Sequence, residues 1–318
     1  MTHIRLGHSP DPDDAFMFYG IARNAVDTDG LTFEHVLADI QTLNEWAREG
    51  RLEVTAISLH AYAHVHDKYA LLPNGASIGD RYGPILVTRA REAVDPKSPD
   101  GGPGGAEGDS PWVNADGGPG GAEGDSPWVN LKGKKIAVPG LMTTAYLVLR
   151  LCLPEFEAYV VPFDQIMDEV RSGRADAGCV IHEGQLTYAD HGLVKVLDLG
   201  AWWHEVEGLP LPLGVDVVRR DLGVETCAKI ARILGDSIQY AMDHRADAVA
   251  YAMEFGRGLD AERTDRFVGM YVNQDTLDYG ERGRKAVRRV LERGHAAGLL
   301  PGSVAVDFVP MEKVGAAG

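Results

Sequence analysis

The chain has 318 residues, of which 45% are hydrophobic and 25% are charged, as is usual for a globular protein. This length allows one large domain or two domains of moderate size. Lys and Arg total 31 against 47 Asp and Glu, so the net charge is −16, and this acidic balance argues against partners that need a basic surface, namely nucleic acids and anionic membranes.

The sequence features that report on the cellular compartment favour the cytoplasm. No apolar stretch of the signal-peptide kind precedes the acidic run that starts at Asp11, and no apolar run is long enough to cross a membrane. Cys152, Cys179 and Cys227 are far apart, odd in number and match no metal-ligand spacing. We therefore expect reduced, partly buried thiols in a cytoplasmic protein.

Strand-like and helix-like segments alternate along most of the chain, which predicts an α/β protein with parallel sheets. In the N-terminal part, strands are expected at residues 4–8, 31–38 and 54–58, and residues 85–88 lead into the next segment. Helices are expected at residues 15–24, at residues 40–49, and from residue 59 through Tyr69.

A segment of different composition follows. Residues 100–114 read DGGPGGAEGDSPWVN, and residues 116–130 repeat the same letters. A segment so rich in Gly and Pro cannot offset its ordering entropy by burial. The composition predicts that residues 91–130 form a disordered acidic insertion between two lobes. The Gly clusters are not a phosphate loop, because no Gly-Lys-Ser or Gly-Lys-Thr follows them.

The second half predicts another α/β unit followed by helices. Strands are expected at residues 135–138, 159–162 and 177–181, helices at residues 144–151 and 165–172, and mostly helix from Leu222 onward. Residues 45–58 and 168–181 share one pattern, a helix end, Gly-Arg, an acidic residue and an apolar strand. We interpret this as two related lobes, residues 1–90 with 207–318 and residues 131–206.

Two such lobes predict a central ligand cleft, because ligands of these sheets bind beyond the carboxyl ends of the strands. Ser58 ends one expected strand, and His182 comes directly after the equivalent strand of the other lobe; both are expected to face this cleft. Ser58 could donate a hydrogen bond to a ligand, or be satisfied by nearby backbone. Ser9, at the tip of the first strand, could also line the cleft. Asp13 and Asp14 favour a capping role, although a carboxylate pair could also do acid–base work.

Thr143 and Thr144 open a helix directly after the strand at residues 135–138. A helix N-terminus presents unpaired N–H groups and partial positive charge, so it could bind the carboxylate or phosphate of a small anionic ligand. The alternative is that one of the two threonines only caps the helix.

The histidines predict proton transfer rather than metal binding. His182 stands on rigid backbone at a strand end, and imidazole suits proton transfer near neutral pH, although the residue could merely bond to a loop. His60 and His64 are four residues apart, but Ala61 stands where a zinc protease carries Glu. No metal is expected here, and these side chains are predicted to lie on a half-exposed helix face.

Taken together, several stretches resemble the 1,4-dihydroxy-6-naphthoate synthase family of the futalosine route to menaquinone. The resemblance covers nearly the whole chain outside residues 91–130. The stretches that carry it are, in chain order, SPDPDDAFMFYG, TLNEWAREGRLEVTAIS, VPGLMTTAYLVL, VIHEGQLTY, DLGAWWHEVEGLPLPLG and YVNQDTLDYGERG.

The resemblance implies a two-lobed fold like that of type II periplasmic binding proteins. It also implies a carbon–carbon lyase, without redox cofactor or metal, that converts cyclic dehypoxanthinyl futalosine to 1,4-dihydroxy-6-naphthoate and a dihydroxyacetone fragment. The family's catalytic base falls on His182. The implied substrate contacts are Ala56, Ile57, Ser58, Thr144 and Ala145. No family role is implied for Asp11 or Asp13.

Two alternatives to this function stay open at the level of sequence. One is a cytoplasmic solute-binding or sensor protein of the same fold without catalysis. The other is chorismate dehydratase, a sister enzyme of the same pathway with the same fold, although the Ile-His-Glu motif at residues 181–183 favours the synthase.

Overall fold

The structure is a computed structural model that describes residues 2–89, 131–255 and 259–310. The expected insertion at residues 91–130 lies outside the described residues. The chain divides into two compact units. The first unit comprises residues 1–78, 142–144 and 212–318, and the second comprises residues 79–141 and 145–211.

The first unit is built on a mixed sheet. Strand β1 runs parallel to β2 and β3, and β11 runs antiparallel to β3 and β4. The strands, in sheet order, are β2 (Thr32–Leu37), β1 (His3–His8), β3 (Val54–Ser58), β11 (Leu211–Arg219) and β4 (Tyr69–Leu71), with β5 (Ser77–Gly79) paired to β11.

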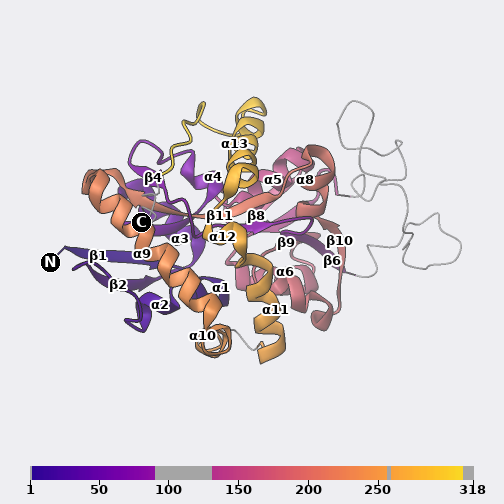
Figure 1. Cartoon of the computed structure of the whole chain (residues 1–318). Helices are drawn as coiled ribbons and strands as arrows, with labels where there is room; N and C mark the ends of the chain where they lie inside the picture. Colours follow the sequence, from indigo (N-terminus) through magenta and orange to yellow (C-terminus); the bar gives the residue numbers. More distant parts are fainter. Residues whose placement is uncertain (1, 90–130, 256–258, 311–318) are drawn as a thin grey trace, which may run out of the picture. The chain divides into compact units, whose positions relative to one another are not determined.

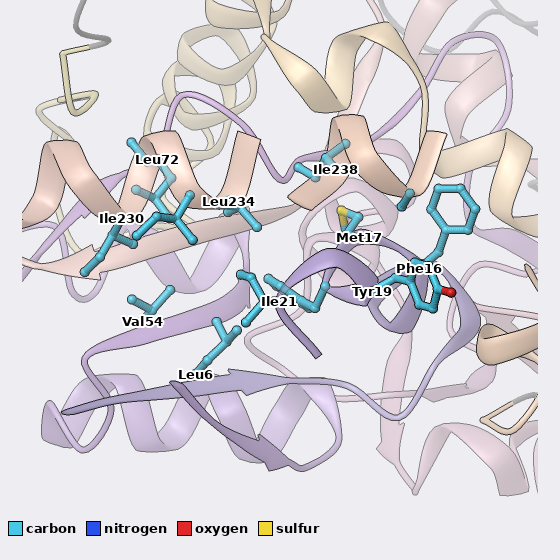
Figure 2. Packing of buried hydrophobic residues seen from close by; sticks show 14 of the residues in the cluster. Leu6, Phe16, Met17, Tyr19, Ile21, Val54, Leu72, Ile230, Leu234 and Ile238 are labelled. Atoms are coloured by element: carbon cyan, nitrogen blue, oxygen red, sulfur yellow. The ribbon is translucent and has the colours of Figure 1, made fainter. Parts of the chain in front are cut away.

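Helices cover this sheet and enclose an apolar core. Long helix α9 packs against α1 and α2, and α1 also contacts α10 and α11 (Figure 1). The core where these helices meet the sheet includes Leu6 of β1, Phe16 and Met17 of α1, and Ile238 of α9, all buried (Figure 2). The helices of this unit are α1 (Pro12–Met17), α2 (Tyr19–Ala22), α3 (Ile40–Glu49), α4 (Leu59–Tyr62), α9 (Val224–Asp243), α10 (Arg245–Ala252), α11 (Ala261–Tyr271), α12 (Gln274–Leu277) and α13 (Gly280–Ala296), with a 3-10 turn at Arg220–Leu222.

Local signals fix both ends of α3. The Asp39 carboxylate accepts hydrogen bonds from the backbone N–H groups of Gln41 and Thr42, which have no partner inside the helix. At the other end Gly50 adopts φ 70°, a left-handed conformation that glycine reaches without steric cost. The helix therefore spans the ten residues that the sequence predicts.

The second unit has its own five-stranded sheet. Its strands, in sheet order, are β10 (Leu193–Asp198), β6 (Ile85–Arg89), β9 (Ala177–Val180), β7 (Lys135–Val138) and β8 (Glu157–Val160). Its helices are α5 (Thr144–Cys152), whose first residue belongs to the first unit, α6 (Ile166–Arg171), α7 (Gly184–Thr187) and α8 (Leu199–Glu207), with 3-10 turns at Phe163–Gln165 and Tyr188–His191.

Helix α6 lies directly on strand β9 of this sheet. A Cβ atom at Gly178 would stand 2.6 Å from Ile166 Cγ2 and 2.8 Å from Val170 Cγ2. Glycine at this position therefore allows the helix to approach the strand that precedes His182.

The two sheets share one strand order. The order β2-β1-β3-β11-β4 of the first corresponds to β8-β7-β9-β6-β10 of the second. In each sheet the first three strands are parallel, and the fourth is antiparallel to its neighbours. The two segments of similar sequence contain α3 with β3 and α6 with β9, so the similarity reflects a repeated topology.

The structure differs from the sequence prediction in several elements. Residues 79–89 do not group with the first lobe, because β6 pairs with β9 and β10 in the second sheet, and residues 142–144 return to the first unit. The helix expected through Tyr69 ends at Tyr62, and Tyr69 begins strand β4 opposite Arg219. The expectation of parallel sheets holds for three strands of each unit only.

The three cysteines are buried and form no disulfide. Within the residues that the structure describes, no helix is both long enough and apolar enough to cross a membrane.

Candidate functional site

The candidate site of the first unit lies at the edge of its sheet where β1 and β3 end. These neighbouring strands are parallel, so their carboxyl ends meet at one edge. Strand β11 runs the other way, and its Gly214 stands opposite Ser58. Ser9, Ser58 and the start of β11 are therefore brought to one edge, as ligand sites of α/β sheets require.

Ser58 is held by Asn44, a residue that the sequence analysis did not single out. The Asn44 Oδ1 atom accepts from the backbone N–H of Ser58 at 2.8 Å, and Asn44 Nδ2 donates to Ser58 Oγ at 3.1 Å. Asn44 is completely buried, beside Leu43 and Ala47 on the covered face of α3. A polar side chain on that apolar face was the signal that could have identified it.

The Thr143–Thr144 segment belongs to the same edge. The Thr144 hydroxyl donates to the carbonyl of Leu213 at 2.7 Å and accepts from the backbone N–H of His60 at 3.2 Å. Because this hydroxyl already donates to the protein backbone, a ligand would bind this segment through backbone N–H groups rather than through the Thr144 hydroxyl. Thr143 is buried as well.

His60 holds this segment in place. The prediction that it lies on a half-exposed helix face is wrong, because only 4% of the residue is exposed. Its Nδ1–H donates to the carbonyl of Thr143 at 3.2 Å. Burial lowers the pKa of His60 to about 4, so the imidazole is neutral near pH 7. His64, one turn later, is exposed.

The other predicted contacts of β3 have little side chain to offer a ligand. Ile57 is completely buried opposite Val215, and Ala56 is buried opposite Asp216. Any contact of these two residues with substrate would involve the backbone. Ser9 is buried, and its N–H donates to Asp14 Oδ2 at 2.7 Å.

The aspartates of the first loop form an acidic group with one residue from β11. Asp13 and Asp14 lie in the first turn of α1, whose N-cap residue, Asp11, makes no side-chain cap bond. Burial raises the pKa of Asp13 well above its ordinary value, and the neighbouring Asp14 and Asp11 add to the shift. Asp14 binds the N–H of Ser9, so its role is to shape the loop beside the strand tip.

Asp216 is the fourth member of this acidic group and was also missed. It is completely buried, and within the described residues neither carboxyl oxygen has a hydrogen-bond partner. Its Oδ2 occupies space beside Gly75, where a Cβ atom would stand 2.0 Å away. Burial raises the pKa of Asp216 well above its ordinary value, with further contributions from Asp14 and Asp13.

We expect Asp216→Asn to stabilise the protein at pH 8 and to leave its stability unchanged near pH 3. A raised folded-state pKa means that the folded chain binds the proton more tightly, so this contribution to stability is complete below the unfolded pKa of 3.8 and is lost as the pH rises. Asparagine carries no charge at any of these pH values, so the variant does not lose this stability as the pH rises. Thermal melts should show a midpoint at least about 2 °C higher at pH 8, the shift that 1 kcal/mol gives in a unit of this size.

The matched control for Asp216→Asn is Asp67→Asn, at an exposed position, which should leave the melting midpoint unchanged at both pH values. A lower midpoint for Asp216→Asn at pH 8 would mean that the carboxylate is stabilised in the folded state, contrary to this account.

His182 lies in the second unit, two residues after strand β9. Its φ is 54°, a left-handed conformation that residues other than glycine adopt at a cost and that is concentrated at functional sites. The backbone is fixed by a hydrogen bond from Gln185 N–H to the His182 carbonyl, and the imidazole meets the Phe163 ring edge-on at 4.8 Å between centroids. The residue is half-buried.

The predicted site residues therefore divide between the two units. The first unit holds Ser9, Ala56, Ile57, Ser58, Thr143 and Thr144, and the second holds Ala145 and His182. Ser58 ends β3 and His182 follows β9, the corresponding strands of the two sheets. Among the described residues, no group of three or more His, Cys, Asp or Glu side chains could hold a metal ion.

Comparison with known proteins assigns the chain to a family. A family model described as menaquinone biosynthesis matches residues 4–99 and 122–296. The chain belongs to this family. The part left unmatched between the two ranges, residues 100–121, falls within the repeated Gly-Pro segment.

Two curated members of the family are similar over nearly the full length. A 1,4-dihydroxy-6-naphthoate synthase of Thermus thermophilus is 38% identical over 97% of this chain and 100% of its own length. The synthase of Streptomyces coelicolor is 33% identical over 94% of this chain and 95% of its own. The resemblance to the 1,4-dihydroxy-6-naphthoate synthase family is confirmed, and the chain is an enzyme of menaquinone biosynthesis.

Solved structures confirm the fold class. A protein of Archaeoglobus fulgidus has a TM-score of 0.80 and 43% identity, covering 94% of this chain and 98% of its own. The alkanesulfonate-binding protein of Xanthomonas axonopodis pv. citri has a TM-score of 0.65 at 12% identity, covering 96% of both chains. At that identity the likeness shows the fold alone, which is that of periplasmic binding proteins.

Proposed function

We propose that this enzyme is a carbon–carbon lyase that converts cyclic dehypoxanthinyl futalosine to 1,4-dihydroxy-6-naphthoate and a dihydroxyacetone fragment. The observation that carries the proposal is full-length similarity to two synthases of that product. The reaction needs a base and groups that hold a small anionic substrate, and the chain offers both at strand ends.

His182 is the proposed base, which removes the proton that starts fragmentation. Support comes from its place after a buried strand and from its left-handed backbone, which would cost stability without a function to retain it. A positioned base of this kind contributes about 10²–10⁴-fold to a rate.

The first unit is proposed to hold the substrate. Ser58 offers a hydroxyl, and the backbone at Thr143 and Thr144, at the start of α5, offers N–H groups with the partial positive charge of a helix N-terminus. Ala145, the next residue of α5, belongs to the second unit and is proposed to contribute its backbone N–H as well. Neutral donors of this kind bind an anion locally, so the net charge of −16 does not oppose binding. The compartment that suits this chemistry and the reduced cysteines is the cytoplasm.

The test is to incubate the purified chain with cyclic dehypoxanthinyl futalosine and to identify the products by mass spectrometry. We expect 1,4-dihydroxy-6-naphthoate to appear. Recovery of the compound bound but unchanged would favour a solute-binding protein. Turnover of chorismate in a parallel sample, with the futalosine compound untouched, would favour chorismate dehydratase.

A further inference from the structure

The orientation of the Asn44 amide follows from its neighbours. The backbone N–H of Ser58 can only donate, so the Asn44 atom 2.8 Å from it must be the carbonyl oxygen. The amide nitrogen then faces Ser58 Oγ at 3.1 Å and the carbonyl of Met142 at 3.5 Å, and that carbonyl can only accept. Both sides of the amide thus require the same orientation.

This orientation determines what the Ser58 hydroxyl can do. Its oxygen already accepts a hydrogen bond from the Asn44 amide nitrogen, so its own hydroxyl hydrogen must be directed elsewhere. Within residues 2–89, 131–255 and 259–310, the Ser58 hydroxyl donates no hydrogen bond of its own. Ser58 is only 4% exposed, so an acceptor is needed there more than at a surface serine.

We propose that Asn44 is a positioning residue that fixes Ser58 as a hydrogen-bond donor, so that the site selects a substrate oxygen that can only accept, such as a carboxylate. Asn44 does this from α3 without touching substrate itself. The naphthoate product carries a carboxylate, which is the chemistry that such a donor recognises, so the proposal deepens the proposed function and rests on it.

Asn44→Asp is the variant expected to turn the Ser58 hydroxyl from a donor toward the substrate into a donor toward residue 44. The introduced carboxylate has the same shape, still accepts from the Ser58 N–H, and now accepts the Ser58 hydroxyl proton as well. The hydroxyl would turn inward and present only lone pairs to the substrate. Asn44→Ala, by contrast, removes the constraint and leaves the hydroxyl free to rotate.

The kinetic test is a double-mutant cycle at pH 7.5 with Asn44→Asp, Ser58→Ala and the double variant. We expect each single change to lower kcat/KM about 10- to 100-fold, as for a lost hydrogen bond to a charged group, mainly through KM because the carboxylate is remote from the reacting bond. In the Ser58→Ala background, adding Asn44→Asp should lower kcat/KM by less than about threefold, because no hydroxyl remains to change direction. Asn44→Ala should lose less than Asn44→Asp.

An equal loss from Asn44→Asp in the presence and absence of the Ser58 hydroxyl would overturn the proposal, since it would show a structural role or simple charge repulsion. Melting curves of all variants identify any that fail to fold. If a variant fails to fold, or if the chain forms no naphthoate, neutron diffraction of the parental protein still locates the Ser58 hydroxyl hydrogen. That measurement does not depend on the proposed function. We expect the Ser58 deuteron to point away from Asn44; a deuteron directed at Asn44 would contradict the inference.

Discussion

His182→Ala should lower kcat by about 10²–10⁴-fold, the range for loss of a positioned general base. KM for cyclic dehypoxanthinyl futalosine should change little, because the groups proposed to hold the substrate lie elsewhere in the chain. Initial rates of naphthoate formation under saturating substrate measure the effect. A variant that keeps the parental kcat would remove His182 from the mechanism.

Two further variants separate the imidazole from the backbone that carries it. His182 has φ 54°, and asparagine tolerates that conformation better than alanine does. His182→Asn should therefore fold at least as well as His182→Ala and lose as much activity. His191→Ala, at an exposed histidine of the same unit, should keep parental rates and melting behaviour.

Phe16→Ala should give the largest loss of stability among the changes considered, about 3–5 kcal/mol, because a buried aromatic side chain leaves a cavity that its surroundings only partly fill. Phe16 is completely buried in α1, with Leu6 and Met17 in the same core cluster (Figure 2). Helix α1 also carries Asp13 and Asp14 beside Ser9, so activity should fall at temperatures where α1 loosens.

Chemical denaturation followed by circular dichroism, compared with Val224→Ala, measures this cost. Val224 is 78% exposed, so its truncation should change stability by less than about 0.5 kcal/mol. Equal midpoints for Phe16→Ala and Val224→Ala would show that α1 contributes little to the core of the first unit.

Local signals explain why some elements were predicted residue for residue. Helix α3 has an Asp39 cap and a left-handed Gly50, and strand β3 is a short apolar run that starts soon afterwards. The expected helix at residues 15–24 was only partly correct, because it is divided at Phe18 into α1 and α2. The helix through Tyr69 was wrong because pairing with β11, from a distant part of the sequence, prevails over local helix propensity.

The candidate site could be proposed from the sequence only where it depends on the end of a strand. Ser58 ends one apolar strand and His182 follows another, and the apolar runs in the sequence indicate both places. Asn44 and Asp216 were not predictable in the same way, because their roles depend on partners such as Met142 and Gly75, which are 98 and 141 residues away, respectively. Strand β11, which brings Asp216 to Ala56, was itself not predicted.

The central proposal is that His182 is the base that acts on cyclic dehypoxanthinyl futalosine. The most direct measurement is a crystal structure of His182→Asn with this compound bound. We predict a carbon-bound hydrogen of the substrate facing the side chain at position 182. Substrate density that does not contact position 182 would contradict the proposal.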